Sequence, residues 1–489
     1  MHSAANRDWV TPAQVRSLYL PPHSHVVDER TLFLGWDNSR KALGMSFPEM
    51  VNGKAATYVV EEGEPVDDRT PGEGSDLTPT QLVQALDDRH DNLIEWASAE
   101  GESTTFKAKL FPSVIPIWTH FPKDNGIPAP SGSDFPAVAL MDAIRQKGAV
   151  ALLRIKPNDY YLCTECSTPE QVRKRAHYEY RHETWRDGDH DTQAEAFGKE
   201  MGEWMLNGNS TGDDDKGNVK RNEIAVSFGA EVAMDWAPWA DAPGNTDEGA
   251  CTCDGGTGKT YVPPAVGAGN TAQLYRKAFR ALRTALRAGV GQAASDASLG
   301  SSATEALKDN IKMVLHYGIQ RGTDTGWNGH NPASDSGFAH VVDIFGFSLY
   351  DHMDGSKNII EMVDPTKNKS IDAGIEWAQS ADGSNPVWLI EWGTLHLGGD
   401  EYSRGQWLKN GLEDIWNEQA EYRRVKVFCY FDLDLSKPDK SPGDWRILGS
   451  DWPEPPATPS GLRARYSDKA RDWRYRPTDS DLDKLFYRP

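Results

Sequence analysis

Short apolar runs recur along the chain and are separated by polar or amphipathic stretches. The runs lie at residues 32–36, 57–60, 114–118, 148–155, 224–228, 311–316, 341–347, 387–390 and 425–431. Between several of them apolar residues recur at helical spacing, at residues 194–206, 271–289, 371–378 and 406–419. Buried strands that alternate with helices are typical of parallel strands joined by crossover helices. The pattern therefore predicts an α/β fold, a (β/α)8 TIM barrel, in which either run 57–60 or run 114–118 is an extra strand.

The predicted barrel extends over residues 26–452 and is flanked by two segments of different composition. Residues 1–25 form an N-terminal arm, and residues 453–489 are first proline-rich and then basic, which indicates a linker and tail outside the barrel. Stretches without strand or helix pattern, at residues 163–191 and 255–271, predict large loops. Long loops that follow the strands of such a barrel usually build its active site.

The composition excludes some classes of partner. A net charge of −21 and a pI near 5.1 argue against a nucleic-acid partner, because a phosphate backbone requires a positive face. No run of 18 apolar residues is present, so no membrane span is expected. The first residues lack the basic and apolar regions of a secretion signal, which leaves a cytoplasmic, a virion-associated or a trimmed secreted protein. The 17 tryptophans offer flat apolar faces of the kind that stack on sugar rings.

Two of the apolar runs lead to a glutamate that has tryptophan nearby. Run 224–228 is followed by Glu231 in FGAEVAMDWAPW, and run 387–390 is followed directly by Glu391 in PVWLIEWGT. Carboxylates at the carboxyl ends of barrel strands point into the mouth, where catalysis occurs. On the fourth and seventh strands they would approach to roughly 5 to 5.5 Å, the separation for retaining cleavage of a glycosidic bond. A strand cap or a salt bridge is the alternative interpretation of each glutamate.

The segment around Glu231 resembles the acid/base motif of glycoside hydrolase family 26, within clan A of the barrel glycosidases. Glu231 matches the family's acid/base, and Trp236 and Trp239 match its tryptophans. The segments NTAQLYRKAFRALRT, VDIFGFSLYD, LIEWGT and VKVFCYFDLD resemble later parts of the family in the same order, so the likeness covers roughly residues 148 to 447. The chain departs from the family at Ala230 and Ala233, where the family has His and Asn.

The resemblance implies a retaining endo-β-glycanase that hydrolyses internal bonds of a polysaccharide through a glycosyl-enzyme intermediate. Glu231 would be the general acid/base and Glu391 the nucleophile, and Tyr350 would orient the nucleophile. The residues expected to contact the substrate are Arg154, Trp236, Trp239, His316, Trp327 and Trp392. No cofactor is expected for catalysis.

Four cysteines form a second candidate site. Cys163 and Cys166 follow the third predicted strand, and Cys251 and Cys253 follow the fourth. Because loops after adjacent strands lie side by side, the four sulfurs are close enough in this arrangement to hold a structural zinc ion. Two disulfides and four free thiols are the alternatives.

A second function class fits the same features. The protein would be a glycan-binding or glycan-depolymerising component of a larger assembly, such as a phage tail, with an intact or a degenerate active site. The proline-rich exit at residue 453 and the segment PPATPSGLRA, which weakly resembles the opening of a fibronectin type III module, suggest an assembly partner that docks through the termini.

Overall fold

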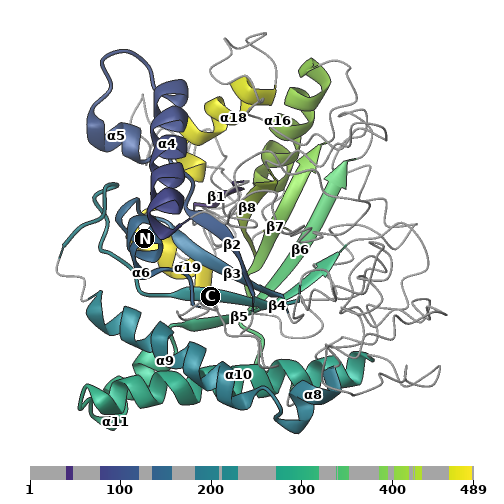
Figure 1. Ribbon diagram of the computed structural model, residues 1–489. Coiled ribbons are helices and arrows are strands. Elements are labelled where there is room, and N and C mark those ends of the chain that lie inside the picture. The colour runs from purple at the N-terminus through teal and green to yellow at the C-terminus, as the bar shows by residue number, and fades with distance from the viewer. Residues whose placement is uncertain are drawn as a thin grey trace, which may run out of the picture.

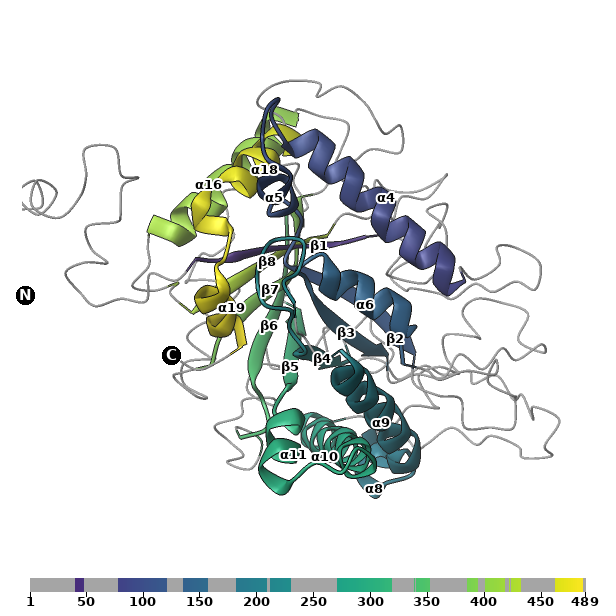
Figure 2. The same cartoon turned by 90° about the vertical axis from the view of Figure 1, so that its left-hand side faces the viewer.

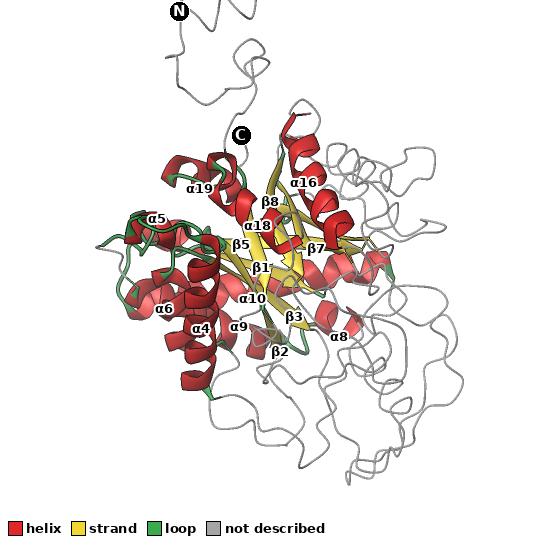
Figure 3. Cartoon of the chain, turned by 90° about the horizontal axis from the view of Figure 1, so that it is seen from above, coloured by secondary structure: helices red, strands yellow, loops and turns green. Residues whose placement is uncertain are grey.

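The computed structural model describes about half of the residues of the predicted barrel and part of the segment that follows it. The described residues are 40–47, 78–120, 135–156, 182–208, 212–229, 271–318, 338, 340–351, 385–394, 401–417, 422, 424–431 and 462–486. Within them, eight strands form a closed barrel in which every strand is parallel to its two neighbours and follows the order of the sequence (Figure 1). Helices surround this barrel (Figure 3). The predicted (β/α)8 TIM barrel is therefore confirmed.

The strands fall close to the predicted apolar runs. They are β1 (Ala42–Ser46), β2 (Val114–His120), β3 (Val150–Lys156), β4 (Ile224–Phe228), β5 (Ile311–Gly318), β6 (Ile344–Asp351), β7 (Val387–Thr394) and β8 (Val425–Phe431). Strands β2 to β8 each overlap a predicted run, and β6 begins three residues later than its run. Run 114–118 is thus part of the barrel, whereas runs 32–36 and 57–60 lie outside the described residues.

The first strand is not among the predicted runs, because its sequence ALGMS is short and contains residues that rarely favour strands. Contacts inside the barrel explain why position 44 is a glycine. A Cβ atom at this position would lie 2.8 Å from the backbone oxygen of Val114 on β2 and 3.1 Å from the sulfur of Cys429 on β8. Closure of the barrel between these two strands therefore requires glycine, and the glycine interrupts the apolar pattern.

The helices of the described residues are α4 (Pro79–Ala97), α5 (Thr104–Ala108), α6 (Val138–Gln146), α8 (His182–Asp187), α9 (Asp191–Asn207), α10 (Ala272–Asp296), α11 (Ser301–Lys308), α16 (Glu401–Asn417), α18 (Leu462–Arg471) and α19 (Asp479–Phe486), with a short 3-10 helix at Trp473–Tyr475. Three predicted helices correspond to α9, α10 and α16, and the fourth lies outside the described residues. The prediction of a loop over residues 163–191 was wrong at its end, where α8 forms. None of the described helices combines the length and apolar character that crossing a bilayer requires.

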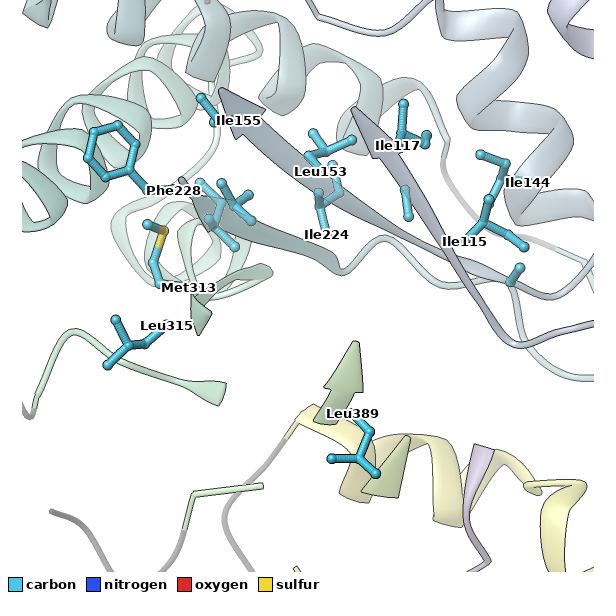
Figure 4. Packing of buried hydrophobic residues seen from close by; sticks show 14 of the residues in the cluster. Ile115, Ile117, Ile144, Leu153, Ile155, Ile224, Phe228, Met313, Leu315 and Leu389 are labelled. Atoms are coloured by element: carbon cyan, nitrogen blue, oxygen red, sulfur yellow. The ribbon is translucent and has the colours of Figure 1, made fainter. Parts of the chain in front are cut away.

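The helices pack on the outer face of the barrel in two large groups. Helices α8 to α11 lie together on the side of β4 and β5, whereas α4, α16 and α18 lie on the opposite side (Figure 2). Outward-facing side chains such as Ile117, Leu153 and Phe228 belong to the core between strands and helices (Figure 4). Since successive residues of a strand face opposite ways, the inward-facing positions form a separate layer inside the barrel.

The C-terminal segment is part of the folded barrel, which corrects the predicted tail outside it. Leu482, Leu485 and Phe486 of α19 are buried in one cluster with residues inside the barrel, among them Trp388. The indole nitrogen of Trp388 donates to the backbone oxygen of Leu485 at 2.9 Å. Helix α19 therefore seals the end of the barrel at which the strands begin (Figure 1). The prediction of a tail was wrong because proline and basic residues dominate the composition of this segment, while the apolar residues of its two short helices are few.

We expect Leu485→Ala to lower the free energy of unfolding by about 2 to 5 kcal/mol, because the side chain is fully buried in this seal. Chemical denaturation measures the change. Asp483→Ala is the control on the same helix: its side chain is 59 % exposed and pairs with Arg221, so a loss within about 1 kcal/mol is expected. Equal losses in the two variants would contradict the sealing role of α19.

Candidate active site

A layer of polar side chains lies inside the barrel toward the carboxyl ends of the strands. Arg154 comes from β3, His316 from β5, Ser348 and Tyr350 from β6, and Glu391 from β7. Arg154 is 1 % exposed and Glu391 is 4 % exposed, and His316 and Ser348 are equally buried. Four of these residues are sequence-predicted site residues, and the structure brings all four together.

An irregularity in β7 turns Glu391 toward the inside of the barrel. Leu389 pairs in register with Phe347, and Glu391 pairs with the next residue, Ser348. Ile390 is therefore an extra residue, a bulge in the pairing with β6. Bulges shift the alternation of side chains by one position and occur beside active sites, where they redirect a side chain.

The same irregularity corrects the prediction that Trp392 contacts substrate. Trp388 and Ile390 face the inside of the barrel, so simple alternation would also turn Trp392 inward. After the bulge Trp392 faces outward, where it is 1 % exposed and stacks on Trp407 of α16 with ring centroids 4.9 Å apart. Trp392 is a core residue between β7 and α16.

Three donors converge on the carboxylate of Glu391. The hydroxyl of Tyr350 donates to Oε2 at 2.6 Å, and the hydroxyl of Ser348 donates to the same oxygen at 3.0 Å. The guanidinium of Arg154 forms an ion pair with Oε1. An anionic carboxylate satisfies all three donors, whereas a protonated one would present a proton to a site that already supplies donors. The prediction that Tyr350 orients Glu391 matches this hydrogen bond.

His316 contacts Ser348 rather than lying free at the surface of the site. Its Nε2 is 2.7 Å from the hydroxyl oxygen of Ser348, and the side chain is fully buried. Burial, reinforced by the positive charge of Arg154, lowers the pKa of His316 well below its usual value of 6.5. The imidazole is therefore neutral at physiological pH. The structure thus links His316 through Ser348 to Glu391, and its direct contact with substrate stays a prediction.

Ser348 is the site residue that sequence reasoning missed. It lies two residues before Tyr350 on β6, and residues two apart on a strand face the same side. The assignment of Tyr350 to the barrel interior therefore also implied Ser348.

Several sequence-predicted residues lie outside the described residues. They are Glu231, Trp236, Trp239, Trp327 and the four cysteines of the candidate zinc site, Cys163, Cys166, Cys251 and Cys253. The strand before Glu231 is β4, the fourth strand as predicted, and β7 is the seventh. Gly229, two residues before Glu231, ends the described part of this segment and has a positive φ of 66°. Its backbone N–H donates to the backbone oxygen of Ile155 on β3 at 2.9 Å, so the contact with β3 continues one residue beyond β4.

The arrangement suits nucleophilic chemistry at a buried carboxylate. The donors hold both oxygens of Glu391 in place, and Arg154 supplies the opposite charge within a low-dielectric layer. Such preorganisation lets a carboxylate attack an electrophilic carbon without rearrangement of its surroundings. Among the described residues no group of three or more His, Cys, Asp or Glu side chains has the arrangement of a metal site.

Comparison with known proteins gives no family for the chain by sequence. No protein-family model matches it, and no curated protein matches it in sequence. Solved structures do show similarity. The exo-β-1,4-mannosidase Op5Man5 from Opitutaceae bacterium strain TAV5 has a TM-score of 0.47 and 12 % identity, over 91 % of this chain and 61 % of its own. A β-glycosidase from Pyrococcus horikoshii has a TM-score of 0.43 and 12 % identity, over 92 % and 97 %. A GH5-4 broad-specificity endoglucanase from Clostridium longisporum has a TM-score of 0.39 and 11 % identity, over 91 % and 95 %.

These values do not assign an activity to this chain. The chain spans about 61 % of the length of the mannosidase chain. The identities are 11 to 12 % and the TM-scores are below 0.5, so these similarities support no argument about function. The fold is assigned from the closed barrel of the structure, and the function has to be argued from the residues inside that barrel.

Proposed function

We propose that this chain is a retaining glycoside hydrolase with Glu391 as its nucleophile and Glu231 as its general acid/base. The observation that carries the proposal is the carboxylate of Glu391, which lies inside the barrel near the carboxyl end of β7 and accepts from Tyr350 and Ser348 while it pairs with Arg154. A carboxylate that served only to cap a strand would not need three donors directed at it from two other strands.

The proposed reaction has two steps. One oxygen of Glu391 attacks the anomeric carbon, the glycosidic bond breaks, and Glu231 gives its proton to the departing oxygen. The product is a glycosyl ester on Glu391. Glu231, now a carboxylate, then takes a proton from water, and the resulting hydroxide attacks the anomeric carbon and releases Glu391. Two inversions at one carbon leave the anomeric configuration unchanged.

The finer parts of the proposal rest on the sequence. The resemblance to family 26 supports internal cleavage of a β-linked polysaccharide, with Trp236, Trp239 and Trp327 as platforms for sugar rings. Arg154 acts through its ion pair with Glu391, as a charge partner of the nucleophile. The four cysteines after β3 and β4 are proposed to hold a structural zinc ion that joins two loops.

The nucleophile is identified by trapping it. We expect 2,4-dinitrophenyl 2-deoxy-2-fluoro-β-glycosides of the cleaved sugar to inactivate the enzyme with time. The fluorine slows both steps, whereas the dinitrophenolate leaving group speeds only the first, so the glycosyl ester accumulates. A panel of polysaccharides and aryl β-glycosides first identifies that sugar. Mass spectrometry of the digested protein is expected to find one fluoroglycosyl group, on Glu391. A label on another residue would refute the assignment, and proton NMR that shows the inverted anomer as first product would refute retention.

A further inference from the structure

A buried hydrogen-bond chain leads from Glu391 into the barrel wall. Ser348 on β6 donates to Glu391 Oε2 at 3.0 Å, and His316 on β5 lies with Nε2 2.7 Å from the Ser348 hydroxyl oxygen. We propose that Ser348 and His316 are positioning residues: His316 fixes the direction of the Ser348 hydroxyl, and that hydroxyl holds the nucleophile Glu391. The proposal rests on the proposed function of Glu391.

The direction of the chain follows from counting protons. A serine hydroxyl has one proton, and Ser348 uses it toward Glu391 because a carboxylate has none to give. Ser348 can therefore only accept from His316, so Nε2 of His316 carries the proton in this contact. Turning the hydroxyl away from Glu391 breaks the hydrogen bond that it donates.

The neutral state of His316 agrees with this direction. Its second ring nitrogen, Nδ1, is buried and has no hydrogen-bond partner among the described residues. A cationic imidazole would bury an N–H group there without an acceptor, which is costly. Burial and Arg154 both lower the pKa of His316, as the single-proton state requires.

The pairing of β5 with β6 places His316 within reach of Ser348. His316 pairs in register with Gly346, so its ring reaches two residues further along β6 to contact Ser348. A Cβ atom at Gly346 would lie 2.7 Å from the side chain of Ile390, the bulge residue before Glu391, and 3.0 Å from that of Val314. The apolar side chains next to the hydrogen-bond chain are therefore closely packed around Gly346.

Kinetics with an aryl β-glycoside test the role of Ser348. We expect Ser348→Ala to lower kcat about 10- to 100-fold with little change in KM, the effect of removing an outer partner of a reacting group. Ser348→Thr keeps the hydroxyl and is expected to restore most of the rate. An unchanged kcat in Ser348→Ala, or an equal loss in Ser348→Thr and Ser348→Ala at unchanged stability, would overturn the proposal.

A double-mutant cycle tests whether His316 acts through Ser348. We expect His316→Gln, which can still donate, to lose less activity than His316→Leu. Combined with Ser348→Ala, His316→Leu is expected to add almost nothing to the loss of kcat, because the hydrogen bond between Ser348 and Glu391 is already absent. Fully additive losses would mean that His316 acts independently, and would overturn its place in the chain.

Nitrogen NMR of protein labelled at histidine gives a readout that does not need turnover. We expect one imidazole with a protonated Nε2 and an unprotonated Nδ1 that does not titrate between roughly pH 5 and 8, and that signal is expected to vanish in His316→Gln. A His316 that titrates in this range, or that carries its proton on Nδ1, would contradict the proposed hydrogen-bond chain. An inactive wild type with the expected spectrum would instead overturn the proposed function and leave the hydrogen-bond chain standing.

Discussion

Glu391→Ala is expected to reduce cleavage of an aryl β-glycoside more than about 10⁴-fold, the largest effect expected for any change in this molecule. The reason is that no other described side chain takes the place of its carboxylate inside the barrel, where Tyr350, Ser348 and Arg154 all contact it. Without this carboxylate the glycosyl ester of the proposed mechanism cannot form. Initial rates with a dinitrophenyl β-glycoside measure the loss, since that leaving group needs no protonation.

Added azide separates the two carboxylates by the product that forms. In Glu391→Ala, azide enters from the side of the missing carboxylate and is expected to give the α-glycosyl azide. In Glu231→Ala the glycosyl ester still forms, and azide is expected to release the β-glycosyl azide. Glu305→Ala on α11, whose side chain is 61 % exposed, is the control and should match the wild type. A β-azide from Glu391→Ala would exchange the two assignments.

Arg154→Met is expected to lower both activity and stability. The side chain is 1 % exposed and the substitution removes the cationic partner of Glu391, leaving a carboxylate in a buried layer with two neutral donors. Breaking such a buried pair costs about 3 to 5 kcal/mol in the free energy of unfolding. Because a charge directed at the reacting group is lost as well, we expect kcat to fall by about 10²- to 10³-fold. Denaturation curves and initial rates measure the two effects.

Two matched variants complete the test of Arg154. Arg154→Lys keeps the positive charge and is expected to recover part of both losses, though not the planar geometry of the guanidinium. Arg287→Met removes an arginine whose partners, Glu305 and Asp309, are exposed, so its effect on stability should remain within about 1 kcal/mol. Equal destabilisation by Arg154→Met and Arg287→Met would show that Arg154 is not an essential partner of Glu391.

The fold was predictable where apolar runs were long and uninterrupted. Strand β8 has seven buried residues in a row and was predicted with its observed bounds. Strand β1 was not, because contact with β2 and β8 requires Gly44 in the middle of a five-residue strand. Helix α19 was not predicted, because it has few apolar residues. Those residues are buried only through their contact with the residues inside the barrel, which the sequence pattern does not show.

The sequence was enough to predict several residues of the candidate site, but not the direction in which each side chain points. The strand-end rule places Glu391 and Tyr350, and the hydrogen bond between them agrees with it. The misplacement of Trp392 has a specific cause, the bulge at Ile390. Nothing in the sequence LIEWGT reveals which of its residues lacks a partner on β6, because that depends on how two strands far apart in the chain align.

The closure between β1 and β8, together with the position of α19, bears on the order in which the molecule folds during synthesis. Ala42 pairs with Val427, so the ring of hydrogen bonds cannot be complete until β8 (residues 425–431) has been made. The apolar end layer stays open still longer, until residues 479–486 arrive. A nascent chain that still lacks these segments exposes strand edges and apolar surface, which is the condition under which chaperones bind.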